Sequence, residues 1–147
     1  MRILYGVQGT GNGHITRARV MLPALKAVGC EVDFIFSGRA KNAYFDMGIF
    51  GDYKVFEGFS FYSHQGSVNW LKTITKASPL RFLKDLRKLN VKDYDLVLTD
   101  FEPLTAWAAK LQAVPSIGLA HQYALCHPIP GTEGSPLLSR ALKSFAP

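Results

Sequence analysis

The residues best suited to chemistry lie in one short stretch near the amino terminus. Glycines alternate there with polar residues and a histidine ends the run, in the order Gly9, Thr10, Gly11, Asn12, Gly13, His14. Glycine reaches positive φ at little steric cost and lets a ligand approach the main chain closely. The free N–H groups of a helix that begins at such a loop favour an anion. The stretch therefore predicts an anion-binding loop beside a candidate acid–base group, since imidazole titrates near neutrality.

A loop of this kind needs a strand before it and a helix after it, and the sequence predicts both. Residues 2–7 form an apolar run typical of a buried strand, and residues 13–28 carry apolar side chains at helical spacing. We expect Gly29 to end that helix. Pro23, in the middle of the pattern, removes one helical hydrogen bond, so we expect a kink or a split helix there.

The same alternation continues along the chain. Further strands are expected at 32–36, 53–56, 95–99 and 116–120, and helices at 41–47, 103–112 and 136–145. Strands that are apolar on both faces and alternate with helices are typical of an α/β domain with a parallel sheet. We therefore expect one doubly wound, Rossmann-like domain with helices on both faces of the sheet, which suits a length of 147 residues.

Polar side chains follow two of the later strands where those strands end. Asp100 and Glu102 follow one strand, and His121 and Gln122 follow the next. Because ligands bind at the carboxyl ends of parallel strands, we expect these residues to meet the glycine loop at one rim of the sheet.

Structural alternatives exist for each of these residues. Glu102 precedes Pro103, which favours a helix N-terminal acid followed by the first helical residue. Asp100 could equally be a cap, and His121 could be a structural histidine. Only the glycines and His14, taken singly, favour a functional role.

The composition limits the partners. An excess of 17 Lys and Arg over 11 Asp and Glu gives a net charge of +6, which suits an anionic partner. The two cysteines, Cys30 and Cys126, stand in no metal-ligand spacing, so we expect neither a metal site nor a disulfide framework. We therefore expect a cytoplasmic location. No apolar run approaches the length of about 18 residues that spans a membrane, so membrane contact would be peripheral.

Basic residues crowd the segment 72–92, where two amphipathic helices separated near Pro79 are expected. They are Lys72, Lys76, Arg81, Lys84, Arg87, Lys88 and Lys92. A solvated helix face is the simplest interpretation, and an anionic membrane surface or an acidic acceptor is the alternative. We do not expect a nucleic-acid partner.

The glycine loop differs from the familiar phosphate motifs. No Gly-Lys-Ser/Thr follows it, so it is not a P-loop. As a dinucleotide fingerprint, its third glycine comes one position early and no acid ends the second strand. Ser37 and Arg39 could accommodate a 2′-phosphate there, so an NADP-binding domain stays open as an alternative.

The run GTGNGHITRA and the later run DFEPLTAWAAKLQAVPSIGLAHQ resemble the N-terminal domain of GT-B-fold glycosyltransferases. The likeness is closest to bacterial and archaeal predicted glycosyltransferases. It is more distant to the lipid-linked N-acetylglucosaminyltransferase of peptidoglycan synthesis and to plant UDP-glucosyltransferases. The resemblance implies that residues 1–147 are the acceptor-side domain, without the C-terminal domain that holds most of the nucleotide-sugar. The implied reaction transfers a sugar from a nucleotide-sugar, expected to be a UDP-sugar, to a hydroxyl of a small-molecule or lipid-linked acceptor, with no cofactor.

The resemblance also implies roles for residues at matching positions. His14 would be the general base and Asp100 would orient and charge it. Substrate or phosphate contacts are expected from Gly9, Thr10, Gly11, Asn12, Gly13, Arg17, Glu102, His121 and Gln122. Arg17 stands where relatives commonly place proline, which implies a different acceptor or an extra phosphate contact. A sugar-nucleotide epimerase of the same fold and a non-catalytic binding domain remain alternatives.

Overall fold

The computed structural model describes residues 1–56, 63–64, 67–68, 79–121, 123, 140 and 144, with the main chain alone at 63–64 and 67–68. Its strands are β1 (Arg2–Gln8), β2 (Glu31–Ser37), β3 (Tyr53–Phe56), β4 (Ser63–His64), β5 (Ser67–Val68), β6 (Leu96–Asp100) and β7 (Ser116–Gly118). Its α-helices are α1 (Asn12–Ala27), α3 (Pro79–Lys88) and α4 (Pro103–Gln112). The predicted helix at 136–145 and most of the first predicted amphipathic helix lie outside the described residues.

Five strands form a parallel sheet in the order β3-β2-β1-β6-β7, while β4 and β5 pair in a separate antiparallel ladder. The central strand β1 pairs with β2 on one side and with β6 on the other. In this register Val7 lies opposite both Phe36 and Asp100. The last residue of β6 is therefore level with the end of β1, where the glycine loop begins.

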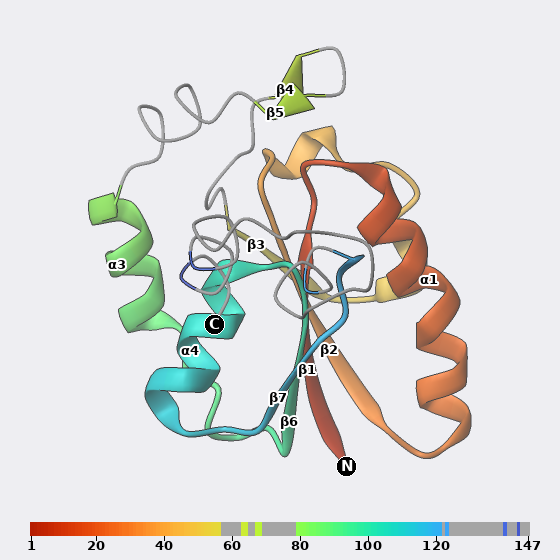
Figure 1. The fold of residues 1–147 in the computed structure, drawn as a ribbon. Coiled ribbons are helices and arrows are strands. Elements are labelled where there is room, and N and C mark those ends of the chain that lie inside the picture. The colour runs from red at the N-terminus through yellow and green to blue at the C-terminus, as the bar shows by residue number, and fades with distance from the viewer. Residues whose placement is uncertain are drawn as a thin grey trace, which may run out of the picture.

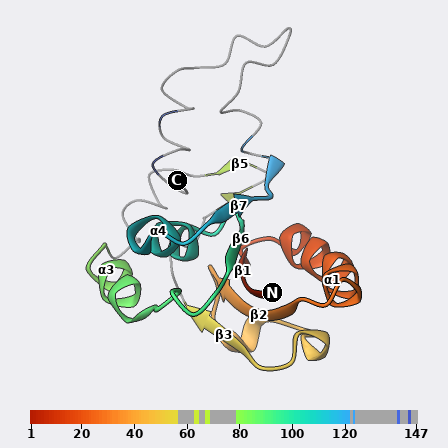
Figure 2. The same cartoon turned by 90° about the horizontal axis from the view of Figure 1, so that it is seen from below.

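Helices cover both faces of the sheet, as the sequence predicts. Helix α1 lies on one face, and α3 and α4 lie on the other (Figures 1 and 2). Side chains alternate along β1 accordingly, because successive residues of a strand point to opposite faces. Tyr5 packs in the core with Leu22 of α1, whereas Leu4 packs in the core with Ala108 of α4.

Helix α4 lies very close to the central strand. A Cβ added at Gly6 would come within 2.0 Å of Thr105 Oγ1, so only glycine allows this approach. The close packing places the N-terminus of α4 at the same end of the sheet as the glycine loop.

Helix α1 is continuous through Pro23, so the predicted split is wrong. Proline removes a single hydrogen bond, and α1 packs against the core on both sides of it, through the buried Ile15, Ala18 and Leu22 before Pro23 and the partly buried Leu25 after it. The predicted end at Gly29 is confirmed by its φ of 78°. Gly29 N–H donates to Lys26 O and Cys30 N–H donates to Leu25 O, which is the Schellman pattern.

The α-helix predicted at 41–47 is also wrong. Two short 3₁₀ turns, Lys41–Ala43 and Gly48–Phe50, occupy this region, and Asp46 between them has a positive φ of 51°. A left-handed residue interrupts right-handed helix propagation. Among the described residues, no helix is long and apolar enough to cross a membrane.

Candidate active site

The glycine loop turns from the end of β1 into α1 with two different kinds of glycine. A Cβ at Gly9 would lie 2.2 Å from the Tyr44 hydroxyl, so Gly9 is needed for packing. A Cβ at Gly11 or Gly13 would meet no atom of the described residues within 4 Å. None of the three has a positive φ, so the predicted conformational reason for them is wrong. Gly11 and Gly13 instead leave an open surface beside the main chain.

A buried polar network supports the loop from below. Glu102 is fully buried and its carboxylate accepts hydrogen bonds from Leu104 N (3.0 Å), Thr105 N (2.7 Å), Thr105 Oγ1 (2.7 Å) and Ser37 Oγ (2.8 Å). Ser37 Oγ also lies 2.9 Å from Gln8 Oε1. Glu102 is thus the N-cap of α4, the structural alternative that its place before a proline indicates, and its carboxylate lies in the interior beneath the loop.

The network continues into the loop, and Arg39 braces the outer side. Gln8 Nε2 donates to Thr10 Oγ1 at 3.2 Å. Arg39 donates through Nε to the Gly9 carbonyl and through Nη2 to Asn12 Oδ1 at 2.7 Å. Arg39, which the sequence offered only as a phosphate ligand of an NADP site, therefore serves to hold the loop. Its long side chain gives no periodic signal that would have indicated this role.

His14, in the first turn of α1, contacts the carboxylate that ends β6. His14 Nδ1 lies 2.6 Å from Asp100 Oδ1. The Asp100 side chain is fully buried and that of His14 is 16% exposed. A carboxylate at Nδ1 selects the tautomer with the proton on that nitrogen, which leaves Nε2 as the proton acceptor. The structure thus brings together the two residues expected to be catalytic.

Arg17, one turn further along α1, shares the same carboxylate. Its Nε lies 2.9 Å from Asp100 Oδ2, an ion pair whose angle falls outside hydrogen-bond geometry. Its Nη1 donates to the Leu119 carbonyl at 2.8 Å. The spacing of 14 and 17 places both residues on one helix face, but their convergence on Asp100 depends on how closely α1 approaches β6.

The backbone between Asp100 and Glu102 is unusual. Phe101 has a positive φ of 55°, which is uncommon for a bulky residue and is found where the surrounding structure imposes it. This turn aims Asp100 at His14 while Glu102 caps α4. The Phe101 ring packs edge-on against Tyr123, with centroids 5.9 Å apart.

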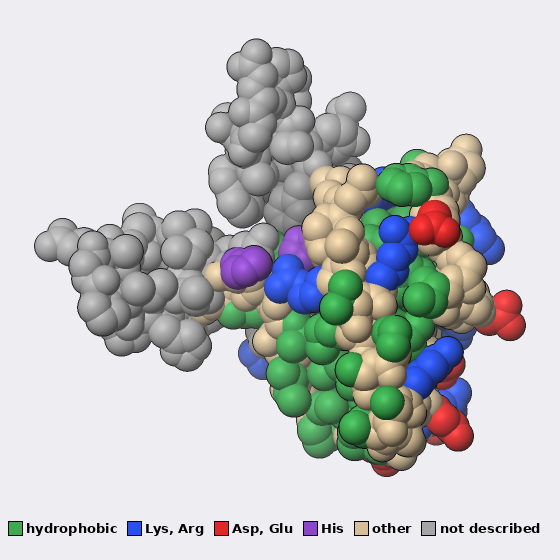
Figure 3. Space-filling model, turned by 90° about the vertical axis from the view of Figure 1, so that its right-hand side faces the viewer, with side chains coloured by type: hydrophobic (Ala, Val, Ile, Leu, Met, Phe, Trp, Pro, Cys, Tyr) green, Lys and Arg blue, Asp and Glu red, His purple; other side chains and the backbone are tan. Residues whose placement is uncertain are grey.

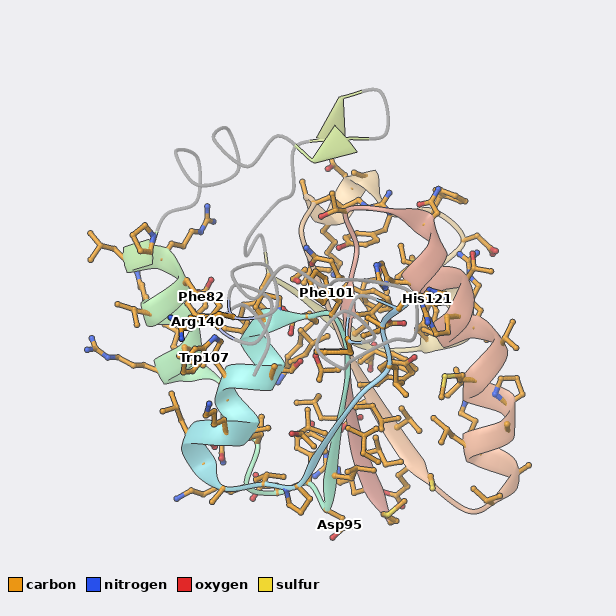
Figure 4. The ribbon with its side chains drawn as sticks, in the orientation of Figure 1. Phe82, Asp95, Phe101, Trp107, His121 and Arg140 are labelled. Atoms are coloured by element: carbon orange, nitrogen blue, oxygen red, sulfur yellow. The ribbon has the colours of Figure 1, made fainter. Side chains whose placement is uncertain are left out.

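An open cavity of about 490 Å³ lies over this cluster, lined by Gly13, His14, Arg17 and His121. His121 is exposed and lies beside α1 in Figure 4, whereas Trp107 and Phe82 lie on the other side of the sheet and Asp95 at its amino-terminal end. Figure 3 shows basic and histidine side chains gathered where the described surface meets the grey residues. Gln122 lies outside the described residues.

A second cavity, of about 310 Å³, lies toward the amino ends of the strands, with Arg2, Asp33 and Tyr94 in its lining. It is remote from Gln8 and Asp100, which end β1 and β6, and from His121, which follows β7. Ligands of open parallel sheets bind outside the carboxyl ends of the strands, so the cavity at His14 is the candidate active site. Across the described part of the chain, no three His, Cys, Asp or Glu side chains group as a metal site.

The parallel sheet with its polar rim at a glycine loop defines the Rossmann-like half of a GT-B glycosyltransferase fold. The chain belongs to glycosyl transferase family 1, whose family model matches residues 1–131. The NADP-binding and epimerase alternatives find no support in this membership. No curated protein sequence matches the chain.

Solved structures agree on the fold. MurG of Acinetobacter baumannii is similar over 99% of this chain and 39% of its own, with 16% identity and a TM-score of 0.50. SsfS6, a glycosyltransferase of Streptomyces sp. SF2575, is similar over 97% of this chain and 42% of its own, with 20% identity and a TM-score of 0.51. The glycosyltransferase VinC, solved with dTDP, is similar over 99% of this chain and 38% of its own, with 13% identity and a TM-score of 0.51. The chain thus spans about two-fifths of these structures.

Proposed function

We propose that this chain is the acceptor-side domain of an enzyme that transfers a sugar from a nucleotide-sugar to a hydroxyl group. His14 Nε2 takes the proton of the acceptor hydroxyl while the hydroxyl oxygen attacks the anomeric carbon of the donor sugar. The bond from that carbon to the nucleoside diphosphate breaks, and the diphosphate leaves. Asp100 holds the ring and stabilises the imidazolium that forms. The N–H groups of the first turn of α1, which has no side-chain cap at Gly11 and no acid, favour the negative charge of the departing diphosphate.

The observation that carries this proposal is the 2.6 Å contact between His14 Nδ1 and the fully buried Asp100, directly under an open cavity. A buried carboxylate is costly unless it is paired. Its place behind an imidazole at a cavity floor is that of an orienting group in general-base catalysis.

Substitution in the full-length enzyme tests the proposal. His14→Ala should lower turnover by about 10²–10⁴-fold, the range expected for loss of a positioned base. Asp100→Asn should also lower turnover, and the double variant should be little worse than His14→Ala, because residues that act as a unit are non-additive. Asp33→Asn, which alters an exposed ion pair with Arg2, is the matched control. Near-normal transfer by folded His14→Ala would rule the proposal out.

We further propose that the donor nucleotide is held mainly by a second domain. The chain spans about two-fifths of the glycosyltransferase structures that share its fold. The cavity at His14 is open, which suits an active site completed by another domain.

An anionic membrane surface is the partner that we propose for α3. Leu80 and Leu83 are 79% and 46% exposed, next to the exposed basic residues Arg81, Lys84 and Lys88. Phe82 and Leu86 face the core, so the exposed leucines belong to an outward face that is both apolar and basic. Helix α3 begins at the same end of the sheet as the glycine loop, and lies across the sheet from α1 (Figures 1 and 2). Apolar burial and attraction of cations to anionic lipid act together on such a face.

Vesicle sedimentation tests this surface. We expect binding to anionic vesicles at low salt and release as salt rises, since each basic residue contributes about 1 kcal/mol near such a surface. Leu80→Ser should weaken binding several-fold, whereas Leu111→Ser, on the exposed side of α4, should not. If the protein shows no more binding to anionic than to neutral vesicles at low salt, α3 is simply a solvated helix face.

A further inference from the structure

Arg17 and His121 form a basic side of the cavity that general-base catalysis does not require. Among the residues that the structure describes, the cavity is lined by one glycine, two histidines and one arginine, with no acid. The nearest carboxylate, Asp100, is fully buried and lies against both His14 and Arg17. A ligand in the cavity therefore meets hydrogen-bond donors and cationic or titratable groups, and is shielded from the negative charge beneath them.

The Arg17 guanidinium is held in place from two directions. Its Nε faces Asp100 at 2.9 Å and its Nη1 donates to Leu119 O at 2.8 Å, while the side chain stays 28% exposed. A guanidinium carries five N–H donors in a rigid fork, so these two contacts leave donors for a ligand. An arginine fixed in this way loses little freedom when it binds an anion, and its fork matches phosphate and carboxylate geometry.

The position of this pair separates it from the glycine loop. Arg17 stands about 4.5 Å further along the axis of α1 than His14, at the helical rise of about 1.5 Å per residue. His121 follows β7, which is two strands away from β1 in the sheet order. With the departing diphosphate at the loop and the base at His14, Arg17 and His121 lie on the acceptor side.

We infer that the acceptor carries a phosphate or carboxylate group close to its reacting hydroxyl, and that Arg17 and His121 bind this group. The inference rests on the proposed function for the meaning of acceptor. It deepens that function by naming the acceptor class, since a guanidinium forms stronger hydrogen bonds with an anionic group than with a neutral one.

Calorimetry on the full-length protein tests the inference with three probes: glycerol 3-phosphate, glycerol and UDP. We expect glycerol 3-phosphate to bind and glycerol not to bind. Arg17→Gln should weaken glycerol 3-phosphate binding at least tenfold, and Arg17→Lys should weaken it less because the charge remains. Arg19→Gln is the matched control, because Arg19 is similarly exposed (24%) but donates to the carbonyl groups of Phe45 and Asp46.

The experiment with UDP distinguishes a phosphate group on the acceptor from the diphosphate of the donor. Glycerol 3-phosphate should bind in the presence of saturating UDP, and Arg17→Gln should change UDP affinity much less than glycerol 3-phosphate affinity. Competition between the probes, or equal weakening of both by Arg17→Gln, would assign Arg17 and His121 to the donor and overturn the inference. Equal binding of glycerol and its phosphate would overturn it as well.

Two features keep the test decisive. If Arg17→Gln fails to fold because Asp100 loses its ion pair, His121→Gln changes an exposed residue and should still weaken glycerol 3-phosphate binding by a few fold; unchanged binding would count against the inference. Probe binding also needs no turnover. Failure of the proposed function would appear as transfer by His14→Ala, whereas failure of this inference would appear as unchanged probe affinity.

Discussion

Glu102 shows how one residue can support a site without touching a ligand. Its carboxylate joins the N-terminus of α4, Ser37 at the end of β2 and, through Ser37, the Gln8 side chain below the glycine loop. The helix N-terminus favours a negative charge at this position. The residue thus links three elements that converge under the candidate active site.

Glu102→Ala should therefore lower the free energy of unfolding substantially. Loss of an N-cap costs about 0.5–2 kcal/mol, and buried donors left without an acceptor cost about 1–3 kcal/mol more. We expect a total loss of about 2–4 kcal/mol in urea unfolding. Glu31→Ala, at the exposed start of β2, is the control and should change stability by less than about 0.5 kcal/mol. A loss for Glu102→Ala no larger than the control's would contradict the role of the network.

The sequence predicted the main pair of the site but not its surroundings. His14 and Asp100 follow from a general rule, since both stand at the carboxyl ends of parallel strands that pair directly. The sharing of Asp100 by Arg17, and the bracing of Gly9 by Arg39, depend on long side chains and on the distances between elements. Local patterns of residue type contain no information on such distances.

At the scale of elements, the glycines of β1 and of the glycine loop serve two different purposes, close packing and access for a ligand. Gly6 and Gly9 face neighbouring side chains so closely that a Cβ would clash, whereas Gly11 and Gly13 face open space. Gly13 lies within the first turn of α1, where a residue with a Cβ is better accommodated than glycine.

Gly13→Ala should leave the fold intact while impairing transfer. We expect unfolding free energy to stay unchanged or to rise by up to about 1 kcal/mol, because alanine restricts the unfolded chain. The added methyl group lies where a ligand would approach the main chain, so kcat/KM should fall tenfold or more. Gly48→Ala, also in open space but distant from the cavity, should leave both quantities unchanged. Full transfer by Gly13→Ala would show that no ligand approaches the loop there.

The elements themselves were predictable where burial repeats regularly. The strand at 53–56 and the helix at 103–112 match β3 and α4, because apolar runs and a proline at the first helical turn mark them. The helix prediction at 41–47 failed because Tyr44 and Met47 are buried although the backbone around the left-handed Asp46 is irregular. When residues of an irregular segment are buried, their spacing in the sequence can resemble that of a short amphipathic helix.

At the scale of the whole molecule, buried tyrosines make stability depend on alkaline pH. Burial raises the pKa of Tyr44 to about 12 and, together with a hydrogen bond to Asp33, that of Tyr94 to about 12. Burial raises the pKa of Tyr5 further. The folded chain thus keeps these phenol protons at pH values where the unfolded chain, with an ordinary pKa of about 10, has released them.

Stability should therefore be complete below about pH 10 and fall as the pH rises toward 12, because the folded state binds more protons in that interval. Urea unfolding at a series of alkaline pH values measures the decline. Tyr44→Phe should make the decline shallower, although it also removes the hydrogen bond to Ser37 O. An unfolding free energy that stays constant above pH 10 would contradict the raised pKa values.

The last prediction concerns how the donor is bound. If a second domain supplies most contacts to the nucleotide, residues 1–147 alone should bind UDP-sugars only weakly. A ligand stabilises a fold by RT ln(1 + [L]/Kd), so a ligand present at its Kd contributes about 0.4 kcal/mol. For a domain of this size that corresponds to a rise in Tm of about 1 °C. Thermal unfolding with millimolar UDP-glucose should therefore show almost no shift, and calorimetry should give no micromolar isotherm. The full-length enzyme is the control and should be stabilised by several degrees. Tight binding by residues 1–147 would place the donor site in this domain, and the open cavity at His14 would then have to hold the nucleotide itself.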